Sequence, residues 1–114
     1  RDVDKMKKAE YMMDHIGEIY EGIISGVQEF GFFVELDNTI EGLVKVENIK
    51  GDYYTFNSDM MALIGKKSKN KYSFGDKVTV KVVRADKDRS EVDFEIYDEK
   101  EKLNNKKNNK NNNK

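Results

Sequence analysis

Hydrophobic and polar positions follow two different periodicities along this chain. Residues 1–16 (RDVDKMKKAEYMMDHI) carry apolar side chains at helical spacing among dense charges, which predicts an amphipathic helix that ends near Gly17. The expected apolar stripe consists of Val3, Met6, Met13 and Ile16. A helix this polar is more typical of a docking or connecting element than of an independent folding unit.

From residue 18 the pattern changes to short runs of period two, divided by glycine and by aspartate or asparagine. We expect five main strands, over residues 19–27, 32–36, 40–46, 77–85 and 90–96. The long insert between the third and fourth strands contains DYYTF and MALIG, which predict a small extra hairpin. This all-β profile is typical of a five-stranded antiparallel Greek-key barrel, the OB-fold, whose second and third strands carry a binding face. An all-β sandwich is the alternative.

Three phenylalanines crowd the second strand, in the segment EFGFFVEL. Side chains alternate along a strand, so Phe32 shares the apolar face with Val34 and belongs in the core, whereas Phe33 shares the outer face with Glu35. Gly31 permits a backbone conformation in which Phe30 joins Phe33 on that outer face. Two outward rings on a barrel predict a stacking platform for unpaired bases. The alternative is that both rings pack beneath the long insert.

Neighbouring charged residues support the prediction of a stacking platform for bases. In the third strand Val44 and Val46 are expected to face inward and Lys45 outward, where its ammonium can meet phosphate. The last turn adds Arg89 for stacking or phosphate contact, and Asp86 as an acceptor for a base edge or a 2′-hydroxyl. Each of these charges alone is more typical of a solvated surface, so the prediction rests on their combination.

Overall charge does not favour nucleic acid by itself. The formal net charge is −1, and the chain is asymmetric: residues 1–50 hold 6 Lys/Arg against 11 Asp/Glu, and residues 51–114 hold 15 against 11. Part of the positive excess lies in residues 98–114, a lysine- and asparagine-rich segment that we expect to be disordered. There is no cysteine, and no apolar run is long enough for a membrane span, so we expect a cytoplasmic protein without a membrane partner.

These segments resemble the S1 RNA-binding domain. GEIYEGIISGVQEFGFFVELDNTIEGLVKV matches the glycine-rich first strand, the FG-x-FV second strand and the GLV-type third strand of that family, and VTVKVVRADKDRSEVDFEI resembles its last two strands. The resemblance implies single-stranded RNA as the ligand and five binding residues: Phe30, Phe33, Lys45, Asp86 and Arg89. Histidine is common in the family where Lys45 stands here. The last turn is one residue longer than usual, which leaves Lys87 as an alternative to Arg89.

The flanking segments narrow the resemblance. The helical segment, the insert with its ALIG run and the lysine-rich tail together are similar to the C-terminal end of bacterial ribonuclease R, a family of processive 3′-to-5′ exoribonucleases of the ribonuclease II type. The resemblance implies three parts: a linker helix over residues 1–16, an S1 domain over 17–97 and a tail over 98–114. It places the catalytic domain, with magnesium as its metal, outside this chain.

Catalytic chemistry is not evident in the chain itself. The single histidine, His15, has no cysteine or second histidine with which to form a metal site, and the turn at residues 86–90 lacks the glycine and glutamate of a calcium loop. We therefore expect no catalytic or metal residues here, and a monomeric RNA-binding module. Two alternatives remain: an OB-fold module that binds protein through its aromatic face, and the S1 domain of another RNA-processing or translation protein.

Overall fold

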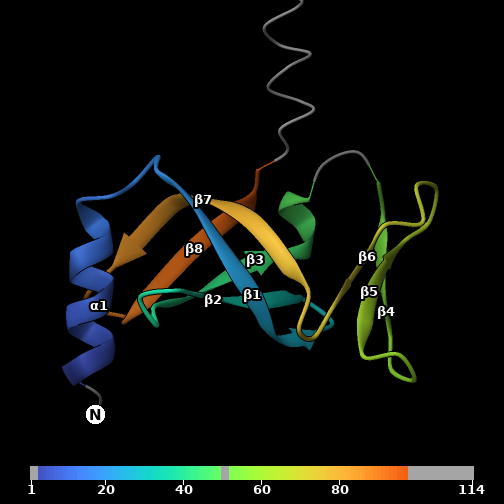
Figure 1. Cartoon of the computed structure of the whole chain (residues 1–114), viewed down its shortest axis with the longest axis horizontal. Helices are drawn as coiled ribbons and strands as arrows, with labels where there is room; N and C mark the ends of the chain where they lie inside the picture. Colours follow the sequence, from blue (N-terminus) through green and yellow to red (C-terminus); the bar gives the residue numbers. More distant parts are fainter. Residues whose placement is uncertain (1–2, 50–51, 98–114) are drawn as a thin grey trace, which may run out of the picture.

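A computed structural model of the chain describes residues 3–49 and 52–97 (Figure 1). The elements are α1 (Val3–Met13), β1 (Ile19–Gln28), β2 (Gly31–Leu36), β3 (Glu41–Lys45), the 3-10 helix η1 (Val46–Asn48), β4 (Tyr54–Asn57), β5 (Ala62–Gly65), β6 (Lys71–Ser73), β7 (Lys77–Asp86) and β8 (Glu91–Ile96). The expected disordered tail lies outside the described residues. Within the described part, no helix is long and apolar enough to cross a membrane.

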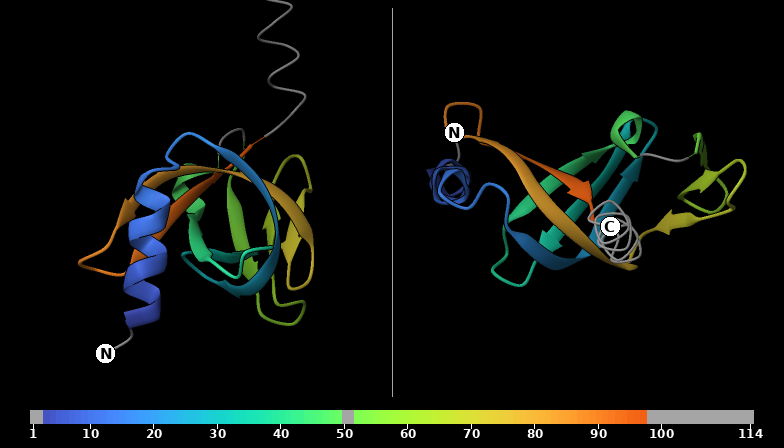
Figure 2. Two further views of the ribbon diagram at one scale, coloured as in Figure 1. Left: turned by 60° about the vertical axis from the view of Figure 1, so that its left-hand side comes forward. Right: turned by 90° about the horizontal axis from the view of Figure 1, so that it is seen from above.

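Five of the strands close into a barrel, in the order β1-β2-β3-β8-β7 (Figure 2). All neighbouring pairs are antiparallel except β3 and β8, which run parallel over a short contact. The predicted all-β Greek-key barrel and its five main strands are confirmed. The pairing of β1 with β2 has a register irregularity between Ile24 and Gly26, which is the kind of irregularity that lets a long strand bend.

The core fills the barrel interior with the inward set that strand alternation predicts. Fully buried side chains come from every strand of the barrel: Ile24, Phe32, Val34, Val44, Val80, Val82 and Phe94. Gly42 makes room for the largest of them, because a Cβ at this position would lie 2.6 Å from the ring of Phe94.

The insert forms a three-stranded sheet, β4-β5-β6, beside the barrel at the end opposite α1 (Figure 1). Our prediction of a two-stranded hairpin was therefore incomplete. The third strand, Lys71–Ser73, has only three residues, too few to show a period in the sequence. Its Tyr72 helps to attach the sheet to the barrel, because this ring stacks on Phe32 with centroids 5.0 Å apart, and Leu63 of β5 is buried in the same core.

The helix packs on the barrel through a different side from the one expected. Its buried residues are Ala9 and Met12, whereas the predicted stripe of Val3, Met6, Met13 and Ile16 is exposed. The prediction was wrong because it followed a stripe of apolar residues at helical spacing that left out both Ala9 and Met12. The small Ala9 allows the helix backbone to approach the β7–β8 hairpin, and Met12 fills the remaining space.

Candidate functional site

Two phenylalanine rings lie beside one another on the outer face where β2 begins. Phe30 is 53% exposed, and its ring centroid lies 6.3 Å from that of the partly buried Phe33, with the ring planes at 85°. Such an edge-to-face arrangement is favourable for aromatic pairs. Gly31 permits the close approach of β2 and β3 at this point, because a Cβ there would collide with the carbonyl oxygen of Val44. The predicted outward placement of both rings is confirmed.

The insert leaves this pair uncovered, because the ring on which it packs is the inward-facing Phe32. Phe33 instead lies between its two cross-strand neighbours, Gly26 on β1 and Leu43 on β3. A Cβ on Gly26 would lie 3.8 Å from Phe33 Cδ2, so the ring passes directly over the glycine. The Phe33 ring therefore lies against the outer face of the sheet and stays partly exposed.

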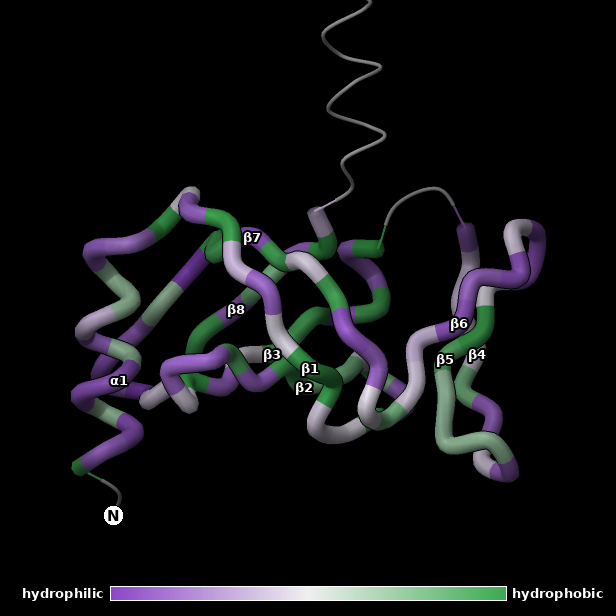
Figure 3. Tube along the Cα trace, viewed as in Figure 1, coloured by the Kyte–Doolittle hydropathy of each residue, from purple (hydrophilic) through white to green (hydrophobic). Residues whose placement is uncertain are grey.

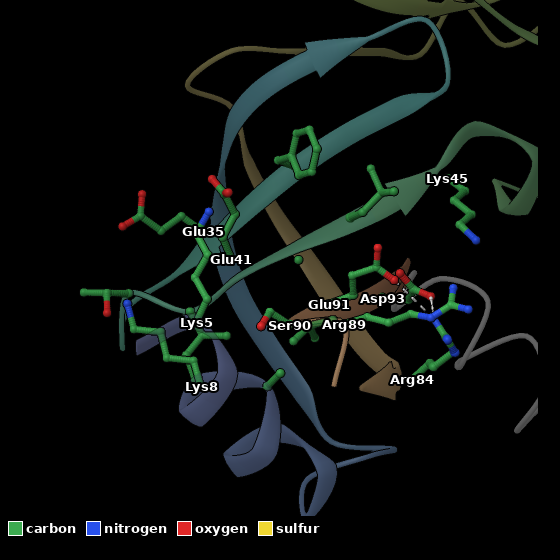
Figure 4. A pocket seen from close by; sticks show the side chains of 17 residues that line it. Lys5, Lys8, Glu35, Glu41, Lys45, Arg84, Arg89, Ser90, Glu91 and Asp93 are labelled. Carbon is green, nitrogen blue, oxygen red and sulfur yellow. Dashed lines mark hydrogen bonds and ion pairs between the residues drawn. The ribbon is translucent and has the colours of Figure 1, made fainter. Parts of the chain in front are cut away.

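Phe33 forms part of the wall of a groove of about 790 Å³ between α1, β3 and the β7–β8 hairpin (Figure 4). Its charged lining is mixed, with five cations (Lys5, Lys8, Lys45, Arg84, Arg89) and four carboxylates (Glu35, Glu41, Glu91, Asp93). In Figure 4 the two helix lysines enter at one end, and Lys45 lies at the other. A groove with this balance binds an anion only where its cations are not already neutralised.

Arg84 faces three carboxylates, of which Glu91 and Asp93 line the groove. Its guanidinium nitrogens lie 3.1 Å from Asp93 Oδ2, 3.5 Å from Asp86 Oδ2 and 3.9 Å from Glu91 Oε1. One planar guanidinium with several donors suits such a cluster, which a lysine would not serve in the same way. Arg84 therefore offsets the negative charge that would otherwise repel a phosphate in the groove.

Sequence reasoning missed Arg84 because strand parity pointed the wrong way. Val80 and Val82 face inward on β7, so simple alternation places residue 84 in the core as well. The register shifts between Val82 and Arg84, where Val82 pairs with Phe94 and Arg84 pairs with Asp93. This bulge at Val83 turns the arginine outward, and no residue in the segment would have predicted a bulge there.

The β7–β8 turn separates its two candidate cations. The Arg89 side chain is 70% exposed and lines the groove, with its Nε 3.9 Å from Asp86 Oδ2. Lys87 Nζ lies instead 3.5 Å from Glu10 Oε2 on α1, and it is absent from the groove wall. The structure thus places Arg89, and not Lys87, in the wall of the groove that Phe33 also lines.

Asp86 stabilises the turn between β7 and β8 through hydrogen bonds to its backbone. Its Oδ1 accepts hydrogen bonds from the backbone N–H groups of Asp88, at 3.0 Å, and Arg89, at 3.3 Å. Its Oδ2 faces Arg84 and Arg89. This carboxylate therefore shapes the turn and directs both guanidiniums. It does not line the groove, so its predicted contact with a base or a 2′-hydroxyl stays a prediction.

Lys45 ends β3 and lines the groove, as expected of an outward residue. Its cross-strand partner is Gly31, so its stem starts beside the ring pair. In the described part of the chain, no carboxylate lies within ion-pair distance of its ammonium. Lys45 thus combines proximity to the rings with an available charge.

Comparison with known proteins identifies a family and several relatives that this chain is similar to. The sequence profile described as S1 RNA binding domain matches residues 14–97. Ribonuclease R 1 of Lactococcus lactis is 53% identical over 95 residues, which are 83% of this chain and 12% of that protein. Ribonuclease R of Ureaplasma parvum is 47% identical over 96 residues, which are 84% of this chain and 13% of that protein.

A solved structure shows the same arrangement of strands. RNase R of Mycoplasma genitalium, in complex with ribose-methylated single-stranded RNA, matches with a TM-score of 0.78 and 26% identity. The match covers 82% of this chain and 15% of that one. The present chain therefore spans only a small fraction of the length of the proteins it is similar to.

Proposed function

The chain belongs to the S1 RNA binding domain family, and from this membership we propose that it holds single-stranded RNA in the groove beside Phe33. The observation that carries the proposal is the exposed ring of Phe30 next to Phe33, at a groove that Lys45 and Arg89 also line. Bases stack on the two rings, and the two cations contact the phosphates between them.

Such a site accepts many sequences. Every base has a face that stacks, and stacking contributes about 1–3 kcal/mol per base. Arg84 neutralises the acidic wall, and Asp86 orders the turn that presents Arg89. Sequence preference is therefore slight, and the discrimination is between unpaired and paired strands, because only unpaired bases can leave their own stack for the rings.

We propose further that the parent protein is of the ribonuclease R type, the name that its relatives carry. The sequence resemblance implies that such a protein is a 3′-to-5′ exoribonuclease. Residues 17–97 then form the domain that captures RNA, and residues 1–16 lead from the catalytic domain. Within residues 3–49 and 52–97 there is no cluster of three or more side chains suited to a metal ion. We assign magnesium-dependent hydrolysis to a catalytic domain outside this chain, because the ribonuclease R relatives are several times longer than the matched segment. We propose that the domain acts in the cytoplasm and as a monomer.

Fluorescence anisotropy with a labelled oligouridylate tests the proposal. The account predicts binding to the single strand and much weaker binding to the same strand paired with oligoadenylate. Equal affinity for both forms would contradict stacking as the basis of binding. Absence of binding to either form would favour the alternative, a module that binds protein through the same aromatic face.

A further inference from the structure

The outer face of the insert combines an exposed aromatic ring with lysines. Tyr54 pairs with Gly65 in the β4–β5 ladder, and the inner ring of Tyr54 packs against the core. The preceding residue, Tyr53, therefore points to the opposite face, and its ring is 76% exposed. Its carbonyl oxygen accepts a hydrogen bond from the N–H of Lys66 at 2.8 Å, so the two side chains are cross-strand neighbours.

Strand register brings further lysines to the same end of the sheet. Lys71 pairs with Ile64, which places it on the outer face with Lys66. The turn between β5 and β6 contributes Lys67 and Lys69, and Figure 3 shows this turn largely in the purple of hydrophilic residues. We name the set Tyr53, Lys66, Lys67, Lys69 and Lys71 the lysine face.

Among the residues that the structure describes, no carboxylate pairs with an ammonium group of the lysine face. Residues 65–71 (GKKSKNK) contain four lysines and no Asp or Glu. All four lysines are exposed, and none forms an ion pair with a described residue. A concentration of unpaired positive charge on one small sheet attracts polyanions and repels other cations.

One carboxylate touches this turn, and it is committed to the backbone. Asp52 accepts hydrogen bonds from the N–H and hydroxyl of Ser68, both at 2.7 Å, and from the N–H groups of Lys67 and Tyr53. The hydrogen bonds from Ser68 hold the pKa of Asp52 well below its usual range. Gly65 leaves space for this carboxylate, because a Cβ there would lie 2.6 Å from Asp52 Oδ2. Asp52 thus fixes the turn while its lysines stay available.

We propose that the lysine face is a second contact surface for single-stranded RNA, with one base stacked on Tyr53 and phosphates on Lys66 and Lys71. The choice of RNA as partner rests on the proposed function of the groove. A sequence-tolerant surface for unpaired nucleic acid combines an aromatic platform with cations that follow the backbone, and both are present here. The insert lies at the opposite end of the molecule from α1, which forms one wall of the groove (Figure 1), so the two surfaces are separate.

The salt dependence of oligouridylate binding tests the cations. Lys66→Gln with Lys71→Gln removes two phosphate contacts, so the slope of log K against log salt falls by about 1.4, at ~0.7 per contact for single strands. The matched control is Lys7→Gln with Lys81→Gln, which removes two exposed lysines that belong to neither surface. The control should keep the wild-type slope. A wild-type slope in Lys66→Gln/Lys71→Gln, or an equal fall in the control, would overturn the proposal.

Tyr53→Ala tests the ring. Loss of one stacked base weakens binding about 5- to 150-fold, whereas Tyr53→Phe keeps the platform and the affinity. The ring is exposed, so the fold tolerates the change, and an unchanged melting temperature of the full chain verifies this. Full affinity in Tyr53→Ala would overturn the assignment of the ring.

The same assay separates this proposal from that of the groove. If Phe30→Ala/Phe33→Ala loses binding and the lysine-face variants bind as wild type, the groove is supported and the second surface is refuted. If the lysine-face variants lose binding and the phenylalanine variant does not, the second surface stands and the proposed function of the groove fails.

Discussion

The groove and the lysine face present aromatic rings and cations in opposite proportions. The groove has two neighbouring rings, but its five cations face four carboxylates, one from β2, one from β3 and two from β8. The lysine face has one ring and four lysines with no acid among them. Stacking should therefore dominate in the groove, and counterion release on the lysine face. Affinity on the lysine face should therefore depend more steeply on salt than affinity in the groove, where stacking supplies the larger share.

The largest expected effect comes from removing the ring pair. Phe30→Ala with Phe33→Ala should weaken oligouridylate binding by about 2–6 kcal/mol, if each ring stacks one base. The salt slope should stay the same, because no cation is lost. Fluorescence anisotropy over a range of salt concentrations measures both quantities.

Phe74 supplies the matched control for the ring pair. Its ring is 71% exposed in the β6–β7 turn, outside both surfaces, and Phe74→Ala should bind as wild type. Unchanged affinity in a Phe30→Ala/Phe33→Ala protein that still unfolds cooperatively would show that the groove does not work by stacking.

An intermediate effect is expected from Arg84→Gln. The change leaves Asp86, Glu91 and Asp93 without their common cation, and repulsion of a phosphate should cost roughly 1 kcal/mol of binding, the size of one charge pair at ~4 Å in a water-like environment. Stability should change by less than about 1 kcal/mol, because exposed ion pairs contribute little.

A second substitution distinguishes two roles for Arg84. If the arginine acts by neutralising Asp93, then Arg84→Gln with Asp93→Asn should recover part of the lost affinity. A double variant that binds no better than Arg84→Gln would show that the arginine contacts RNA itself.

Lys45 and Lys87 provide a smaller and sharper comparison. Lys45→Gln should reduce the salt slope by about 0.7, the loss of one phosphate contact. Lys87→Gln should leave the slope unchanged, because Lys87 Nζ faces Glu10 Oε2 at 3.5 Å and lies outside the groove. Equal salt slopes for the two variants would show that Lys45 makes no phosphate contact in the site.

The smallest expected effect concerns how the stability of the insert depends on pH. Hydrogen bonds from Ser68 lower the pKa of Asp52 in the folded state, so the charged carboxylate stabilises the fold above its ordinary pKa, and this contribution is lost as the pH falls through the folded value. The difference in melting temperature between wild type and Asp52→Asn should therefore be full at neutral pH and shrink in acid. A difference that is independent of pH would contradict the assignment of the hydrogen bonds to the anion.

Alternation of side chains was enough to predict much of this molecule. It assigned Phe32 to the core and Phe33 to the outer face, and it placed Lys45 beside the rings. These predictions succeeded because β2 and β3 pair in continuous register, from the pair Gly31–Lys45 to the pair Glu35–Glu41. Where a strand stays regular, parity along the sequence is equivalent to a face of the sheet.

The failures have local physical causes. The bulge in β7 reverses parity and hid Arg84, and nothing in the run of valines marks its position. The helix buries Ala9 and Met12 and leaves the predicted apolar stripe exposed, because close approach to the hairpin at Ala9 requires a small side chain. The third strand of the insert is held by the stacking of Tyr72 on Phe32, a contact between residues far apart in the chain.

The most direct test of the central claim is the proton spectrum of the phenylalanine rings of Phe30 and Phe33 during a titration with oligouridylate. Bases that stack on these rings shield their protons, so the account predicts upfield shifts at both rings that saturate together with binding. Saturable binding that leaves both ring systems at their free positions would contradict it.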